Sequence, residues 1–160
     1  MIRSMKTSDI PRVAEIHVFG QRTAYRGFVS DDFLFGKMTV EARIKYFESN
    51  ETEGYVFDDG LIKGFITLGP CKDEDKVDTF ELYRIFVDPF MFGGGVGYKL
   101  AVHFEEVAIK QGYNKVCLWV LEGNANARGF YEKLGYTMDG AKRISGYFGV
   151  PEVRYTKEAM

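Results

Sequence analysis

Apolar residues recur with two different periods along the chain, and each period predicts one kind of element. A spacing of three or four positions, typical of a helix with one buried face, covers 9–25, 39–49, 96–111 and 124–134, with a further helical stretch at 31–35. Shorter runs rich in β-branched and aromatic residues predict strands at 2–6, 55–58, 61–68, 80–87, 116–121, 136–144 and 152–156. The expected order is therefore β-α-α-β-β-β-α-β-α-β-β.

Local signals mark several element ends. Ser8 or Asp9 can cap the first helix, with Pro11 in its first turn, and Gly112 ends the third helix. The pair Asp59-Gly60 predicts a tight hairpin. Because hairpins join the early strands and helices join later ones, the order predicts an α+β fold, with a mixed, mostly antiparallel sheet flanked by helices on both faces. A length of 160 residues suits one domain over 1–160.

The junction between the strand ending at Pro89 and the helix that follows carries the clearest chemical signal. Four glycines stand within the five positions 93–97. Glycine lets backbone approach a ligand closely, and the unpaired N–H groups at a helix N-terminus favour a phosphate or pyrophosphate. The pattern is not a P-loop, because Tyr98 and Lys99 follow Gly97 where Lys and Ser or Thr are needed. It does not fit the dinucleotide pattern G-x-G-x-x-G either.

The stretch resembles the acyl-CoA loop of the GCN5-related N-acetyltransferase (GNAT) superfamily, which reads Arg/Gln-x-x-Gly-x-Gly/Ala after a strand ending V-x-P. Both family glycines are matched here, by Gly95 and Gly97, whereas Phe92 stands where Arg or Gln is usual. A second segment, from Asn124 to Tyr136, resembles the family motif N-x-x-A-x-x-F-Y-x-K-x-G-F/Y at every signature position.

This resemblance implies acetyl-CoA as co-substrate. The residues it assigns to the coenzyme are Ile85, Phe86, Val87, Phe92, Gly93, Gly94, Gly95, Val96, Gly97, Tyr98, Asn124, Ala127 and Phe130. The strand residues would pair with the pantetheine arm through their backbone, as an added strand does. An N–H near Val87 would face the thioester oxygen. Asn124 is at least equally well explained as a helix cap.

Two residues are candidates for proton transfer. By the resemblance, Tyr131 would be the general acid that protonates the departing thiolate, and a core aromatic on one helical stripe is its alternative interpretation. Glu81 would be the general base that takes a proton from the amine, directly or through water. A solvated or salt-bridged strand residue, paired with Arg84, is the alternative for Glu81.

The acceptor pocket is predicted with less detail. Tyr25, Tyr83 and Tyr147 could line it, although ordinary packing explains each of them as well. His17 on an apolar helix face predicts a core histidine with satisfied nitrogens, and Cys117 in mid-strand predicts an inert buried thiol. No metal is expected, because no pair of His, Cys or carboxylate residues has metal-ligand spacing.

Composition narrows the class further. A net charge of −2 argues against nucleic acid as the main partner, and no apolar run is long enough to span a bilayer. The N-terminus shows no signal peptide, and two cysteines are too few for a disulfide scaffold, so the cytoplasm is the predicted location. The alternating residues 152–156 are typical of an edge or half-covered strand, and with the resemblance they predict a homodimer.

Together these features predict an acetyl-CoA-dependent N-acetyltransferase that moves an acetyl group to a primary amine of a small molecule or peptide, directly within a ternary complex. Phe92 keeps open an alternative, a catalytically weak acyl-CoA-binding regulatory module. Acetylation of histone-like or ribosomal proteins is disfavoured by the acidic net charge.

Overall fold

The computed structural model describes residues 1–91 and 93–159, so the prediction made for Phe92 lies outside the described residues. The helices are α1 (Ile10–Tyr25), α2 (Val40–Ser49), α3 (Val96–Lys110) and α4 (Ala125–Lys133), with short helical turns η1 (Thr7–Asp9), η2 (Phe33–Lys37) and η3 (Glu74–Lys76). The strands are β1 (Ile2–Ser4), β2 (Gly54–Asp58), β3 (Ile62–Pro70), β4 (Phe80–Val87), β5 (Lys115–Leu121), β6 (Thr137–Ile144) and β7 (Pro151–Glu158).

The strands form one mixed sheet in the order β1-β2-β3-β4-β5-β7-β6. β4 and β5 run parallel, whereas β1–β2, β2–β3, β5–β7 and β6–β7 are antiparallel pairs. The predicted fold class, an α+β protein with a mostly antiparallel mixed sheet, is therefore confirmed. Among the described residues, no helix has the length and apolar character needed to cross a membrane.

The chain divides into two compact units. Unit 1 comprises residues 1–68 and 84–104, and unit 2 comprises residues 69–83 together with the chain from residue 105. The glycine loop belongs to unit 1, whereas Glu81 and Tyr131 belong to unit 2.

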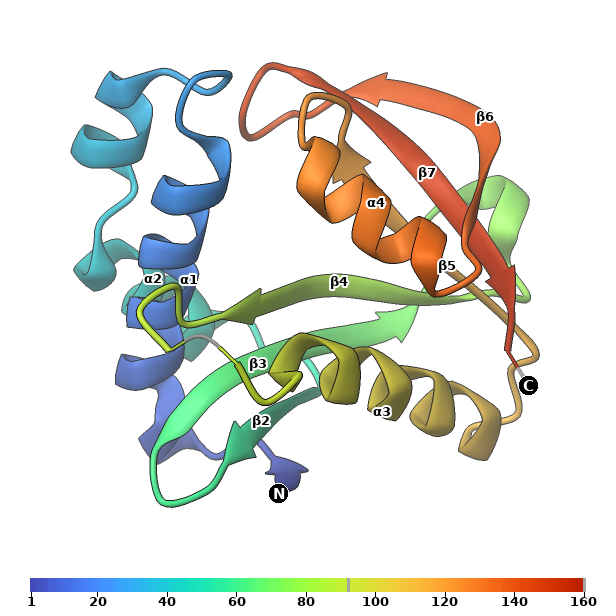
Figure 1. Ribbon diagram of the computed structural model, residues 1–160, viewed down its shortest axis with the longest axis horizontal. Helices are drawn as coiled ribbons and strands as arrows, with labels where there is room; N and C mark the ends of the chain where they lie inside the picture. Colours follow the sequence, from blue (N-terminus) through green and yellow to red (C-terminus); the bar gives the residue numbers. More distant parts are fainter. Residues whose placement is uncertain (92, 160) are drawn as a thin grey trace. The chain divides into compact units, whose positions relative to one another are not determined.

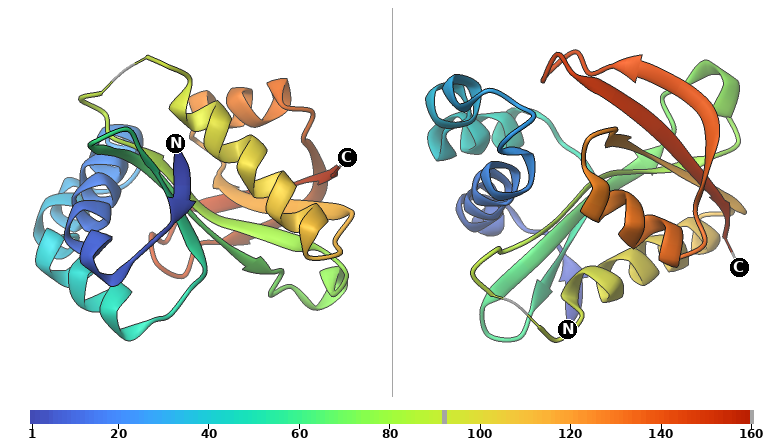
Figure 2. Two further views of the ribbon diagram at one scale, coloured as in Figure 1. Left: turned by 90° about the horizontal axis from the view of Figure 1, so that it is seen from below. Right: turned by 45° about the horizontal axis from the view of Figure 1, so that its top comes forward.

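Unit 1 is built around the apolar face of α1, which lies beside α2 in both Figure 1 and Figure 2. α1 begins with Pro11 in its first turn, where a missing N–H costs no hydrogen bond. Thr39 caps α2 by accepting a hydrogen bond from the N–H of Ala42 at 3.2 Å. The buried core residues are Ile10, Val13, Ala14, Ile16, Phe47, Val56, Ile62 and Phe65.

Unit 2 contains the β5-β7-β6 part of the sheet together with α4. β7 pairs with β5 over residues 152–158 and with β6 on its other side, so of the two predicted alternatives for residues 152–156 the edge strand is wrong. β7 is interior because β6 pairs with its outer side. The alternation of residue types along a strand does not show how many neighbouring strands that strand has. The edge strand is β6, which is exposed at seven of its eight positions.

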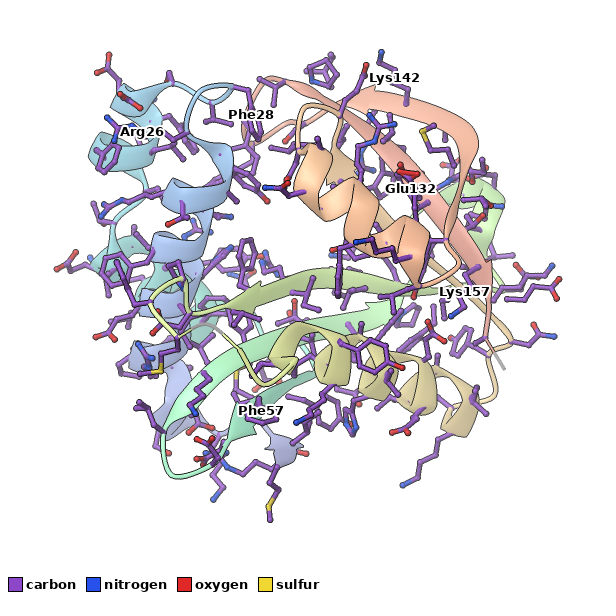
Figure 3. All side chains as sticks on the ribbon, in the orientation of Figure 1. Arg26, Phe28, Phe57, Glu132, Lys142 and Lys157 are labelled. Atoms are coloured by element: carbon purple, nitrogen blue, oxygen red, sulfur yellow. The ribbon has the colours of Figure 1, made fainter. Side chains whose placement is uncertain are left out.

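α4 has the ends that the second motif predicts. Asn124 is its N-cap and accepts a hydrogen bond from the N–H of Ala127 at 3.2 Å. After the helix, Gly135 has a φ of +93° and the N–H of Tyr136 donates to the carbonyl of Tyr131, which closes the last turn. Figure 3 shows Glu132 on α4 and Lys157 on β7, and the Glu132 carboxylate accepts a hydrogen bond from the hydroxyl of Tyr155, also on β7.

Candidate active site

The glycine loop has a backbone that only glycine adopts without strain. Gly93, Gly94 and Gly95 have φ values of +95°, +74° and +63°. A Cβ added at any of the three would meet no described atom within 4 Å, so the requirement is for the backbone angle and not for space. This loop joins directly to α3, whose ladder begins with the N–H of Lys99 donating to the carbonyl of Gly95 at 3.0 Å.

The first turn of α3 follows from that geometry. In any α-helix the first N–H groups have no acceptor within the helix, and here they belong to Val96, Gly97 and Tyr98. The Tyr98 side chain is 57% exposed. The loop and the helix start thus present backbone donors where the sequence predicted a pyrophosphate site.

β4 leads into this loop, and its half-buried Phe86 side chain packs against the core of unit 1. The Phe86 ring stacks on Phe65 with centroids 6.0 Å apart and lies 4.9 Å from the ring of His17. A Cβ on Gly20 of α1 would stand 2.7 Å from the Phe86 ring, so glycine is needed there for close packing. Because the Phe86 side chain is turned toward this core and packs against it, the backbone is the part of the residue that a ligand along the strand would contact. Tyr25, predicted to line the acceptor pocket, also contacts the Phe86 ring.

Glu81 is a buried carboxyl in unit 2, with 8% of its surface exposed. It lies beside Cys117 in the parallel β4–β5 register, and its carboxylate accepts a hydrogen bond of 3.4 Å from the N–H of Lys72. Burial raises the pKa of the Glu81 carboxyl, and hydrogen bonds from the Lys72 backbone and the Cys71 thiol oppose that rise only in part. A base is more effective when its pKa approaches the operating pH.

The alternative interpretation, in which Glu81 pairs with Arg84, is not what the structure contains. The Arg84 guanidinium donates to the hydroxyl of Tyr46 at 2.9 Å and to that of Thr67 at 3.4 Å. Arg84 is therefore held by neutral hydroxyls within unit 1.

Tyr131 lies on α4 and is 8% exposed. Its ring packs against Phe130, Tyr136 and Tyr155, with centroids 5.4, 5.9 and 6.5 Å away. This packing fixes the direction of the phenol. The same packing makes Tyr131 part of an aromatic cluster in unit 2, which is the contact that the alternative interpretation expects.

The two remaining predicted acceptor tyrosines lie in unit 2. The Tyr83 hydroxyl donates to the carbonyl of Pro70, and its ring lies over Gly69, where an added Cβ would stand 2.7 Å from the hydroxyl oxygen. Burial raises the pKa of Tyr83 to about 12, so this phenol stays neutral at physiological pH. Tyr147 lies in the loop after β6, is 45% exposed, and packs edge-on against Phe148.

His17 differs from its prediction in one respect. It is a core residue, as predicted, and its Nε2 lies 2.7 Å from the Nε2 of Gln21. Its Nδ1, however, has no hydrogen-bond partner within the described part of the chain, so the histidine is not fully satisfied. Burial lowers the pKa of His17 well below its ordinary value, and the nearby charges of Arg84 and Arg43 lower it further.

The sequence did not reveal one cluster in unit 2. The thiols of Cys71 and Cys117 lie 3.3 Å apart, and Glu81 lies with them, so one ligand atom of each residue falls within 4.8 Å of the others. The two cysteines are separated by 46 positions. No local spacing could show this cluster, because the pairing of β4 with β5 joins Glu81 to Cys117 and the connection after β3 brings Cys71 to them.

Comparison with known proteins identifies the family. The model of the acetyltransferase (GNAT) family matches residues 11–136. The chain is 29% identical over 126 residues to YuaI, an uncharacterized N-acetyltransferase of Bacillus subtilis (strain 168), covering 77% of this chain and 72% of that protein.

Solved structures agree in fold. The PaiA N-acetyltransferase of Thermoplasma acidophilum, in complex with coenzyme A, has a TM-score of 0.73 at 21% identity, covering 99% of this chain and 98% of that one. The ribosomal-protein-alanine N-acetyltransferase of Brucella melitensis has a TM-score of 0.73 at 20% identity, covering 99% of both chains. The family match spans most of the sequence, so the chain belongs to the acetyltransferase (GNAT) family. It is accordingly an N-acetyltransferase.

Proposed function

We propose that the protein transfers the acetyl group of acetyl-CoA to a primary amine of a small molecule or peptide, by direct attack within a ternary complex. One observation carries the proposal: Gly93, Gly94 and Gly95 all have positive φ and lead directly into α3, in a chain of the GNAT family. Three consecutive glycines in this conformation have backbone N–H donors and no side chains, an arrangement that suits a pyrophosphate. That the Thermoplasma protein was solved with coenzyme A supports the same ligand here.

The acyl arm would lie along β4. This strand pairs with β5 over Phe80–Leu82 and continues to Val87 beside the loop. The backbone of Ile85, Phe86 and Val87 would hold the pantetheine amides, and an N–H near Val87 would stabilise the thioester oxygen as negative charge develops there. Asn124, Ala127 and Phe130 of the second motif would contact the same arm, with Asn124 also serving as the cap of α4.

Starting from the ammonium, the nitrogen must lose two protons and the sulfur must gain one. Glu81 would take the first proton from the ammonium, directly or through water. The amine nitrogen then attacks the thioester carbon, and the C–S bond breaks as Tyr131 protonates the departing sulfur. The second proton of the nitrogen passes to the Tyr131 phenolate, which restores the phenol, and Glu81 returns its proton to solvent. Each proton transfer contributes roughly 10²- to 10⁴-fold to the rate, and alignment of amine and thioester contributes about 7–11 kcal/mol.

The candidate acceptor residues are Tyr25 in unit 1 and Tyr83 and Tyr147 in unit 2. The packing of Tyr25 on Phe86 supports a place beside the coenzyme strand. The neutral hydroxyl of Tyr83 is bonded to Pro70, so its ring is the part that would contact a substrate. A peptide amine also belongs to the proposed class of acceptor, the primary amines. The Brucella protein, a ribosomal-protein-alanine N-acetyltransferase, has the same fold.

The test of the coenzyme site uses a matched pair of glycines. Gly95 and Gly112 stand at opposite ends of α3, both have positive φ, and a Cβ at either meets no described atom within 4 Å. Both Gly95→Asp and Gly112→Asp should therefore cost similar stability, about 1–2 kcal/mol. Only Gly95→Asp should weaken CoA binding, measured by calorimetry, because it brings a negative charge to the pyrophosphate. Equal CoA affinity in the two folded variants would overturn the loop assignment.

Turnover needs a second measurement. Thiol release from acetyl-CoA should be followed with a panel of small amines and peptides, comparing the wild type with Glu81→Gln. The proposal expects acceptor-dependent release that falls roughly 10²- to 10⁴-fold in the variant. Tight CoA binding without release on any amine would favour the regulatory module instead.

A further inference from the structure

Both cysteines of the chain lie at one point in unit 2, and a carboxyl lies with them. The Sγ atoms of Cys71 and Cys117 are 3.3 Å apart, and together with a carboxylate oxygen of Glu81 they form a set of three ligand atoms within 4.8 Å of one another. We propose that these three residues bind a thiophilic divalent cation, for which Zn²⁺ is the best match.

The fold holds this triad in place. Glu81 and Cys117 are opposite one another on the parallel strands β4 and β5, whose pairing fixes their separation. Cys71 directly follows β3, and its N–H donates to the carbonyl of Thr79 at 2.9 Å. Two ligands thus stand on strands and the third on a segment that is hydrogen-bonded back toward β4, which limits the rearrangement that binding requires.

Charged side chains hold the segment that carries Cys71. The carboxylate of Asp73 accepts hydrogen bonds of 2.9 Å from the indole of Trp119 and from Arg154. The same Arg154 guanidinium donates to Asp75 at 2.7 Å and to Asp139 at 2.7 Å, and it is buried. Because one guanidinium joins three carboxylates, the position of the segment does not depend on the metal.

The donor set and its spacing suit Zn²⁺. Two thiolates and one carboxylate are borderline-to-soft ligands, whereas Ca²⁺ and Mg²⁺ require sites made of oxygen. With Zn–S bonds of about 2.3 Å, two thiolates on one tetrahedral ion stand roughly 3.8 Å apart. The thiols at 3.3 Å need to separate only slightly. Three protein ligands leave a fourth position for water, as in zinc sites that stay open to exchange.

Protonation would compete with the metal. Burial raises the pKa of both thiols and of the Glu81 carboxyl, so the thiols are protonated at neutral pH before an ion arrives. A bound ion must displace those protons, and its apparent affinity therefore rises with pH. Cys71 is only half-buried, which gives an ion an approach to the two buried ligands.

Zn²⁺ binding would also affect catalysis, and this one consequence rests on the proposed function. Glu81 is the proposed general base, and a carboxylate that ligates Zn²⁺ cannot also accept a proton from the amine. Zn²⁺ should therefore inhibit acetyl transfer reversibly. Metal binding itself is measured without acetyl-CoA or any amine, so a failure of the proposed function leaves the binding test intact.

The first experiment measures Zn²⁺ binding to the phosphine-reduced protein by competition with a chromophoric chelator. Co²⁺ is used as a spectroscopic substitute. The wild type should bind one equivalent and show thiolate-to-cobalt charge-transfer absorption. The affinity for Zn²⁺ should fall at least roughly 10- to 100-fold in each of the variants Cys117→Ser, Cys71→Ser and Glu81→Gln. That is the loss expected when only an outer-shell partner of a ligand is removed. Glu74→Gln, which changes an exposed carboxyl three positions after Cys71, is the matched control and should bind like the wild type.

A second measurement needs no variant that has to fold. Zn²⁺ added to the wild type in weak buffer at neutral pH should release about two protons per ion, one from each thiol. It should also protect both thiols from a thiol-reactive reagent, and the chain has no other cysteine to obscure the count. Reduced protein that releases no protons, or that binds Zn²⁺ no more tightly than Cys71→Ser, would overturn the site.

Discussion

Unit 1 and unit 2 carry different kinds of predicted site residue. Unit 1 supplies mainly backbone, because the conformation of Gly93–Gly95 and the first turn of α3 make the coenzyme loop. Unit 2 carries side chains, with the proton-transfer candidates Glu81 on β4 and Tyr131 on α4, and the two thiols of the proposed metal site. A site made of backbone is encoded in consecutive residues. A site made of side chains depends on which strands become neighbours.

The largest expected effect tests the side-chain half of this contrast. Tyr131→Phe keeps the ring contacts with Phe130, Tyr136 and Tyr155 and removes only the hydroxyl. If the phenol protonates the leaving thiolate, kcat should fall roughly 10²- to 10⁴-fold with little change in the melting temperature. Full turnover in the variant across the pH range would return Tyr131 to the role of a core aromatic.

The same contrast explains which features of the structure could be predicted from the sequence. The glycine loop, the Asn124 cap and the Gly135 helix end were predictable because each depends on residues a few positions apart. The interior place of β7 and the meeting of Cys71 with Cys117 were not, since both depend on sheet pairing between distant segments. The incomplete hydrogen bonding of His17 was hidden for a related reason: periodicity shows which face is buried but not which polar atoms meet there.

A substitution that tightens CoA binding would test how much of that binding the backbone of the glycine loop supplies. Phe92→Arg restores the residue usual at the first loop position in the family. A charge-assisted hydrogen bond to phosphate should tighten CoA binding by about 1–2 kcal/mol, which is roughly 5- to 30-fold, and make it more sensitive to salt. Calorimetry at two salt concentrations measures both effects. Unchanged affinity would mean that the backbone alone sets the strength of phosphate binding.

The two units should also respond oppositely to mild acid. Because the folded pKa of His17 is lowered, the unfolded chain takes up the proton first, and unit 1 should lose stability as pH falls below 6.5. Because the folded pKa of Glu81 is raised, the folded protein takes up the proton first, and unit 2 should gain stability as pH falls toward 4.5.

Each of these groups contributes a slope of at most about 1.4 kcal/mol per pH unit. Hydrogen exchange in α1 and β5 between pH 6.5 and 4.5 would measure the two slopes separately. His17→Phe should flatten the first and Glu81→Gln the second. Slopes of the same sign in both wild-type units would remove this contrast.

The smallest expected effect concerns assembly. The homodimer predicted from the sequence stays a prediction, but its contact can no longer use β7 as an edge. The candidate edge is β6, where Met138 and Ile144 are 53% and 62% exposed, near the loop that carries Tyr147. Ile144→Lys should weaken dimerisation about tenfold, a change of 1.4 kcal/mol. Equilibrium sedimentation of both proteins is the measurement, and a monomeric wild type at micromolar concentration would contradict the dimer.

The three glycines of the coenzyme loop have a consequence that concerns chirality. At positive φ, and with open space where a Cβ would stand, Gly93, Gly94 and Gly95 exclude L-residues by handedness and not by size. A D-alanine introduced by chemical synthesis has the matching handedness. It would restrict the unfolded chain and stabilise the protein by about 0.4–1 kcal/mol. Because a D-residue suits the backbone angle and also adds a methyl group, its separate effects on the melting temperature and on CoA binding would distinguish what the backbone needs from what the coenzyme needs.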